Sequence, residues 1–161
     1  MRPQEKGLNE ALQSLATTVR LMEPAQSRLR LRFGLSCAQR VAHLLEDPRA
    51  TAGVATLQAF LEGQGDAMAL ENARREVEAV ARSHPGSTSI DGTAHAAVSA
   101  THAVADALAG RALDAASYAA YAAVYAYSGS AVTDPSAFDE EFRWQVAELA
   151  RLSASGPGAE R

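Results

Sequence analysis

Two histidines and an aspartate form the one cluster in this sequence with the residue types of an enzyme or a metal site. His95, His102 and Asp106 stand at i, i+7 and i+11, so a helix would place all three on one face. Helical bundles hold metal with imidazole and carboxylate ligands, but they use several Glu residues and Glu-x-x-His pairs. No Glu-x-x-His occurs here. We therefore expect no metal, no cofactor and no catalysis, and keep a metal-binding or enzymatic bundle at these residues as the alternative.

Other motifs for catalysis are weaker. Cys37 falls in the apolar series Phe33–Cys37–Val41, a position typical of a small buried thiol. The sequence has no Gly-x-Ser-x-Gly elbow. The Gly-Gln-Gly at 63–65 lacks the Gly-Lys-Ser/Thr of a phosphate-binding loop. These observations favour a protein that acts by binding.

Tyrosines and acidic side chains are the candidates for contact with a protein partner. Tyr118, Tyr121 and Tyr125 stand at i, i+3 and i+7, where they either fill space beside small neighbours or present a rigid contact surface. The densest acidic run comprises Asp134, Asp139, Glu140, Glu141 and Glu148. Most of these carboxylates fall in the first two turns of a predicted helix. There they either complement the helix dipole or attract a cationic partner.

Alanine dominates the segment that carries the histidines and the tyrosines. The chain has 36 Ala in 161 residues, and 16 of them occupy the 33 positions from 94 to 126. Because Ala has the highest helix propensity, we expect helices near 91–109 and 111–127, with a break at Gly110. Their small side chains allow the axes of this central hairpin to approach closely, toward the lower end of the usual ~8–10 Å.

Apolar spacings of three and four predict further helices around the hairpin. We expect them at 8–22, 24–46, 48–62, 67–82 and 135–152. The two Asp-Pro pairs at 47–48 and 134–135 are typical helix starts. No segment shows the alternation of a strand. The prediction is an all-α single domain at 1–152, a bundle of six to seven helices, followed by a flexible tail at 153–161.

Charge and composition limit the partners and the compartment. Residues 1–40 hold seven Lys and Arg against three Asp and Glu, and residues 41–161 hold eight against sixteen. Nucleic acid is a poor partner because phosphate binding needs a dense basic face, whereas a basic protein fits an acidic surface. A single cysteine favours a reducing compartment. Without an N-terminal apolar stretch, or an uncharged run of about 18–20 apolar residues, we expect a cytoplasmic protein without membrane contact.

Three segments of the chain resemble the immunity proteins of bacterial polymorphic-toxin and bacteriocin systems, in the all-helical group numbered as family five. The first is Arg-Phe-Gly-Leu-Ser-Cys-Ala-Gln-Arg at 32–40, followed by Leu-Leu-Glu-Asp-Pro-Arg at 44–49. The second is the Ala-rich helix pair with His95 and His102. The third is Glu-Phe-Arg-Trp-Gln-Val-Ala-Glu-Leu at 141–149. Together they extend over about residues 28–152.

The resemblance implies a protein that binds a cognate toxin and blocks it without catalysis of its own. Together with the charge pattern, it predicts an acidic surface that covers the active cleft of a toxin with a basic surface. The expected contacts are Asp139, Glu140, Glu141, Arg143, Trp144, Tyr121 and Tyr125. For Trp144, packing in the core is the competing interpretation. A self-associating scaffold or adaptor, forming a homodimer through the Ala-rich hairpin, is a further alternative.

Overall fold

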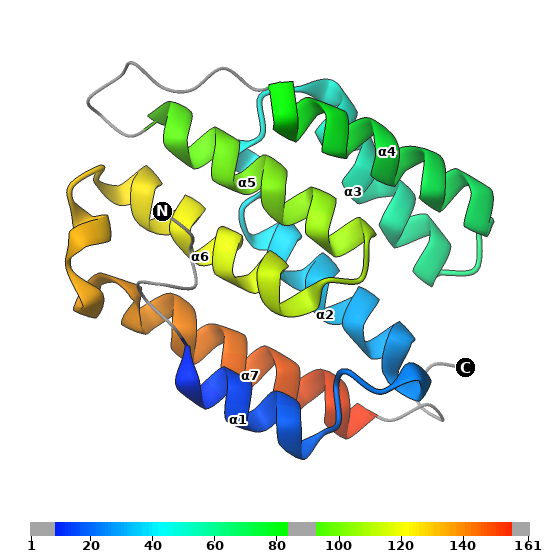
Figure 1. Cartoon of the computed structure of the whole chain (residues 1–161), viewed down its shortest axis with the longest axis horizontal. Coiled ribbons are helices and arrows are strands. Elements are labelled where there is room, and N and C mark those ends of the chain that lie inside the picture. Colours follow the sequence, from blue (N-terminus) through cyan, green and yellow to red (C-terminus); the bar gives the residue numbers. More distant parts are fainter. Residues whose placement is uncertain (1–8, 84–92, 156–161) are drawn as a thin grey trace.

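The computed structural model describes residues 9–83 and 93–155, and these residues form seven α-helices and four short 3₁₀ segments without a strand (Figure 1). The α-helices are α1 (Glu10–Thr18), α2 (Ser27–Arg40), α3 (Pro48–Leu61), α4 (Ala67–Ser83), α5 (Thr93–Leu108), α6 (Ala112–Tyr127) and α7 (Asp139–Ser155). The 3₁₀ segments are η2 (Pro24–Gln26), η3 (Ala42–Leu44), η4 (Ala131–Thr133) and η5 (Pro135–Phe138). The all-α prediction is confirmed. None of the described helices is long and apolar enough to cross a membrane.

The first helix is shorter than its apolar pattern predicts. The pattern indicates a helix at 8–22, but α1 ends at Thr18 because Arg20 takes a left-handed conformation with φ +58°. The backbone N–H of Leu21 then donates to the carbonyl of Ala16 at 2.9 Å, which closes the helix end. Leu21 is fully buried, so its apolar side chain belongs to the predicted stripe although its backbone has left the helix.

Two other boundaries also differ from the prediction. The predicted helix at 24–46 is divided into η2, α2 and η3. The helical path has to end before Asp47, since a residue that precedes proline is pushed into an extended conformation. At the other end of the chain, the predicted Asp-Pro start opens η5, which leads into α7. α7 continues to Ser155, so the first residues of the predicted tail at 153–161 are helical.

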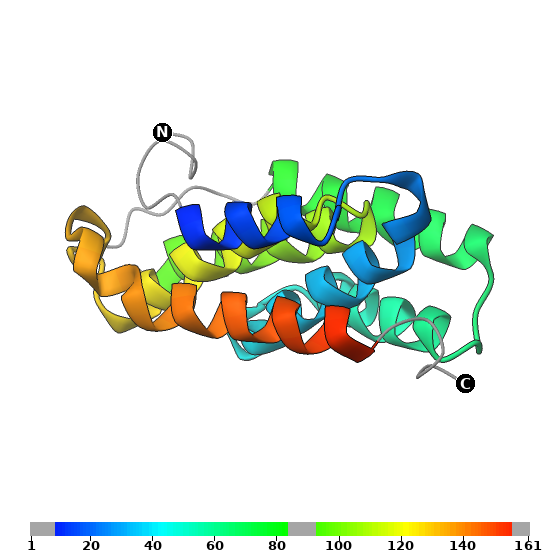
Figure 2. The same ribbon diagram turned by 90° about the horizontal axis from the view of Figure 1, so that it is seen from below.

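The Ala-rich hairpin of α5 and α6 lies at the centre of the fold (Figure 1). α2 packs against both of its helices, and α3 and α4 form a second hairpin that packs against α5. On the other side, α7 packs against α2 and α6 with α1 beside it, as the view from below also shows (Figure 2). This arrangement confirms the central position predicted for the hairpin.

Small residues allow these helices to approach closely. Gly34 on α2 lies against α5, where a Cβ at this position would stand 3.1 Å from Cα of Ala107. Gly53 on α3 lies against α4, where a Cβ would stand 2.7 Å from Cγ2 of Val77. The fully buried face of α6 is largely alanine, at positions 112, 115, 116, 119, 120 and 122. The core is therefore thin and depends on backbone contact.

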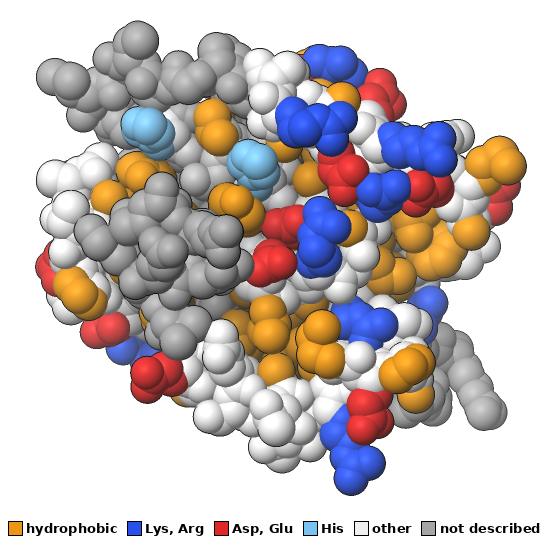
Figure 3. Space-filling view, in the orientation of Figure 1, with side chains coloured by type: hydrophobic (Ala, Val, Ile, Leu, Met, Phe, Trp, Pro, Cys, Tyr) orange, Lys and Arg blue, Asp and Glu red, His pale blue; other side chains and the backbone are white. Residues whose placement is uncertain are grey.

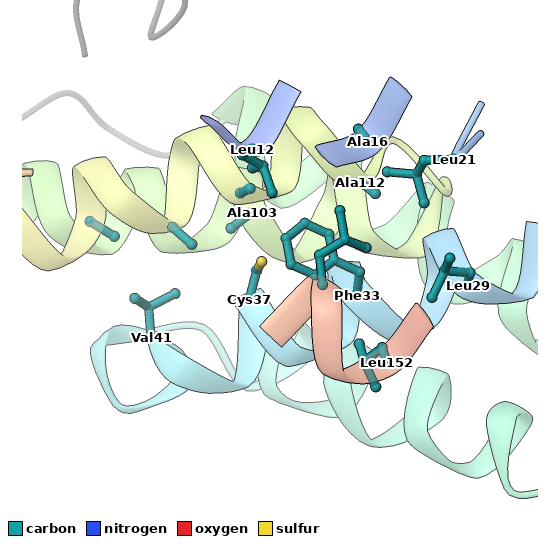
Figure 4. Packing of buried hydrophobic residues seen from close by; sticks show 14 of the residues in the cluster. Leu12, Ala16, Leu21, Leu29, Phe33, Cys37, Val41, Ala103, Ala112 and Leu152 are labelled. Carbon is teal, nitrogen blue, oxygen red and sulfur yellow. The ribbon is translucent and has the colours of Figure 1, made fainter. Parts of the chain in front are cut away.

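The main core cluster joins α1, α2 and α7 to the hairpin (Figure 4). Phe33 and Cys37 project from α2 into its middle, and both are fully buried. Leu12 of α1 and Leu152 of α7 belong to the same cluster. Burial raises the pKa of the Cys37 thiol far above its ordinary value, because the thiolate would lose its hydration. The prediction of a buried, structural cysteine is confirmed.

Candidate partner-binding surface

The two histidines of the predicted chemical cluster are stacked on tyrosines of the neighbouring helix. The ring of His95 lies 5.1 Å from that of Tyr125 with an interplanar angle of 24°. The ring of His102 lies 4.8 Å from that of Tyr118 with an angle of 18°. Both pairs join α5 to α6, and Figure 3 shows histidine side chains on this face of the molecule. Stacking on aromatic rings is a packing role for these imidazoles.

Asp106, the third member of the predicted cluster, is buried at 8% exposure and pairs with Arg111. The guanidinium of Arg111 donates to the Asp106 carboxylate at 2.8 Å and reaches Glu78 of α4 at 3.4 Å. Burial raises the pKa of Asp106, and the hydrogen bond from Arg111 opposes that effect. Among the described residues, no three His, Cys, Asp or Glu side chains are grouped closely enough to hold a metal ion. His95, His102 and Asp106, the residues of the metal-binding alternative, are therefore not grouped as a metal site in the described part of the chain.

The tyrosine series divides between core and surface. Tyr118 and Tyr125 carry the histidine stacks and are half-buried. Tyr121 turns toward η5, where its ring meets that of Phe138 edge-on at 5.1 Å, and it is only 6% exposed. Tyr121, predicted as a partner contact, is thus packed in the core; at about 100° per residue it lies roughly 60° around the helix from Tyr118 and roughly 40° from Tyr125.

The charged residues at the start of α7 also fall into two groups, one exposed and one paired within the fold. Asp139, Glu140 and Arg143 are exposed. Glu141 instead accepts two hydrogen bonds from the guanidinium of Arg40, at 2.7 and 3.0 Å. The same guanidinium lies 4.5 Å from the ring centre of Trp144. Glu141 and Trp144 therefore hold α2 and α7 together.

Sequence reasoning missed Arg40 and the polar link at the start of α1. The Asn9 amide donates to the carbonyl of Phe142 at 3.3 Å and to Oε1 of Gln145 at 3.2 Å. The Gln145 amide donates in turn to the carbonyl of Ala116 at 2.8 Å, and Gln145 is buried. An asparagine before a helix is a recognisable N-cap signal, but its contact 136 residues away is not visible in local sequence.

Three adjoining hollows surround the N-terminal half of α7. Their volumes are about 290 Å³ between α1, α6 and α7, about 500 Å³ between α1 and α7, and about 540 Å³ between α6, η5 and α7. Asn9 and Phe142 line the first two, and Asp139 and Arg143 line the last two. Tyr127, 86% exposed, borders the third. The hollows and the exposed charges between them form what we call the α7 surface.

The fold is thus an all-helical domain with exposed charges and hollows along one of its outer helices. Residues 20–152 match a family model described as Imm-5 like putative immunity protein. This match covers most of the chain, so the protein belongs to that family of immunity proteins, and the resemblance drawn from sequence is confirmed. α1 lies outside the matched residues. No curated protein and no solved structure gives a significant match.

Proposed function

We propose that this protein binds a cognate toxin through the α7 surface and neutralises it by covering its active cleft. Membership of the immunity-protein family supports a toxin as the partner. The observation that carries the choice of surface is the state of its charges. Asp139, Glu140 and Arg143 are exposed, and none of them forms an ion pair with another described residue. They are therefore available to a partner.

Several charges elsewhere on the molecule are paired with one another. Arg74 bridges two glutamates of α4, at positions 71 and 78. Arg151 pairs with Glu148 in the next part of α7. Figure 3 shows positive and negative side chains intermixed over α4. A face of mutually paired charges attracts a charged partner less than one with free carboxylates, since the opposite charges cancel at a distance.

The mechanism is steric, and electrostatic attraction accelerates it. A basic toxin is drawn to Asp139 and Glu140, and such attraction raises association rates toward about 10⁸–10⁹ M⁻¹s⁻¹ at low salt. Once docked, the helical domain excludes substrate from the toxin's cleft. This requires no reacting group on the immunity protein.

Co-expression with the product of the neighbouring gene, tested as the toxin, examines the proposal. We expect the toxin alone to stop growth, the pair to grow, and a stoichiometric complex to be purified from the surviving cells. Growth arrest that this protein does not relieve, with no complex formed, would contradict the proposal. The mass of the free protein in solution, measured in parallel, distinguishes a monomer from the homodimer of the scaffold alternative.

A further inference from the structure

The middle hollow, between α1 and α7, has an apolar lining open to solvent. It is formed by Ala11 of α1 together with Phe142, Val146 and Ala147 of α7. Both alanines are exposed, and Phe142 and Val146 are half-buried. Asn9, Asp139 and Arg143 also line it. Apolar surface next to polar and charged side chains is typical of protein interfaces.

The lining of this hollow is fixed before any partner arrives. Asn9 caps α1 by accepting from the backbone N–H of Leu12 at 3.1 Å, while its amide donates to the carbonyl of Phe142. Gln145 accepts from the same amide and donates to α6. α1, α6 and α7 are therefore tied together around the hollow. A preformed pocket lowers the entropy cost of binding, because its side chains are already ordered.

The charges around the hollow favour a basic partner. Asp139 and Glu140 line the adjoining hollow between α6, η5 and α7. Glu141 also lines that hollow, but its charge is balanced by Arg40. Arg143 is the one cation among the described residues that line the three hollows. Among the described residues on this side of the apolar pocket, carboxylates thus outnumber cations.

We infer that this pocket receives a large apolar side chain of the toxin, carried on a segment whose neighbouring Lys or Arg residues pair with Asp139 and Glu140. The inference rests on the proposed function and names the part of the partner that the α7 surface fits. The apolar side chain contributes binding energy by desolvation, and the flanking cations fix its register.

Two alanines of α7 provide a matched test. Ala147 lines the pocket, whereas Ala150 lies three residues further on, is also exposed and lines none of the three hollows. The probe is the product of the neighbouring gene, titrated into the full-length protein by calorimetry. We expect Ala147→Trp, which fills the pocket, to weaken binding about tenfold or more, as for loss of a central contact. Ala150→Trp should leave the affinity nearly unchanged.

A second variant tests the charge of the flanking residues. Ala147→Lys retains a good helix former and places a cation where the basic segment docks, so we expect weaker binding that worsens at low salt. Circular dichroism and melting temperature of each variant report whether the fold is retained. Because all these positions are exposed, we expect folded proteins in each case.

The outcomes separate this inference from the proposed function. If Ala147→Trp binds the toxin as tightly as the wild type, or if both Trp variants weaken binding equally, the pocket is not the contact site. Toxin binding itself then still stands. Binding that Ala147→Trp weakens and Ala147→Lys does not overturns the basic character of the segment. A wild-type protein that neither protects cells nor binds the toxin overturns the proposed function, and the inference falls with it.

Discussion

Arg40 and Glu141 are 101 residues apart in the chain and meet through two parallel hydrogen bonds of 2.7 and 3.0 Å. Neither side chain is more than a third exposed. The Arg40 guanidinium also stacks over Trp144, so one planar cation contacts two neighbouring residues of α7. This contact fixes α7, and with it the proposed toxin-binding surface, against α2.

We expect Arg40→Lys to lower the free energy of unfolding by about 1–2 kcal/mol, because lysine keeps the charge but loses the two-pronged geometry and the stacking. Urea denaturation measures this loss. Arg49→Lys is the control, since Arg49 pairs with Asp47 at the surface and should lose nothing measurable. In a double-mutant cycle of Arg40→Ala and Glu141→Ala, strictly additive losses would show that the pair is not coupled.

Arg20→Gly should stabilise the protein by about 1 kcal/mol, because Arg20 occupies a left-handed conformation that glycine adopts without strain. Gly110 adopts the same left-handed conformation, with φ +77°, at the end of α5, and a Cβ added there would meet open space. Gly110→Ala should therefore destabilise through the backbone alone. Thermal unfolding of both variants measures the two effects. An Arg20→Gly protein that melts at a lower temperature than the wild type would contradict the left-handed conformation of Arg20.

Gly34→Ala should destabilise the protein by about 1–3 kcal/mol, because its new methyl group would press on the backbone of α5 at Ala107. Gly65→Ala is the matched control, since a Cβ there meets its nearest neighbours at an ordinary 3.7 Å. Denaturant midpoints compare the two substitutions. Equal effects would mean that α2 and α5 do not approach at Gly34 as closely as the 3.1 Å distance to Cα of Ala107 indicates.

Asp106 and Glu148 should change stability with pH in opposite directions. Burial raises the pKa of Asp106, so its contribution is fully present below its unfolded pKa and is lost as pH rises through the folded value. Hydrogen bonds from Arg151 at 2.8 and 2.9 Å lower the pKa of Glu148. Its contribution is present above the unfolded value of about 4.3 and is lost as pH falls toward the folded one.

Unfolding free energies of the wild type, Asp106→Asn and Glu148→Gln, measured from about pH 7 down to about pH 3, check these signs. As pH falls, the wild type should gain stability relative to Asp106→Asn and lose it relative to Glu148→Gln. Two differences that move in the same direction would show that one of the carboxyl groups has been assigned the wrong environment.

Charge neutralisation on α7 should slow toxin binding more than it speeds dissociation. For the double variant Asp139→Asn/Glu140→Gln we expect an association rate reduced about 3–10-fold at low salt, with a shallower salt dependence. Glu76→Gln removes an exposed carboxylate of α4 and should change neither. Stopped-flow mixing with the toxin measures the rates. Association rates equal to that of the wild type would place the contact on another face.

The sequence by itself determined the helical class, the Ala-rich hairpin, the buried cysteine and the family. These features depend on interactions within a few residues. Alanine favours a helix wherever the chain runs, Asp-Pro starts one, and an apolar residue at every third or fourth position produces a buried face. The left-handed end at Arg20 was not predictable, since glycine is the residue that normally marks it.

Only the tertiary structure decided which side chains meet. Helical spacing places His95, His102 and Asp106 on one side of α5, but the packing of α6 and the turn after α5 give the histidines tyrosine partners and the aspartate an arginine. In the same way, Glu141 is held against α2 by its hydrogen bonds with Arg40, while the neighbouring Asp139 and Glu140 are exposed. The physical reason is that periodicity defines the face of a helix, whereas the partner of that face comes from a distant part of the chain.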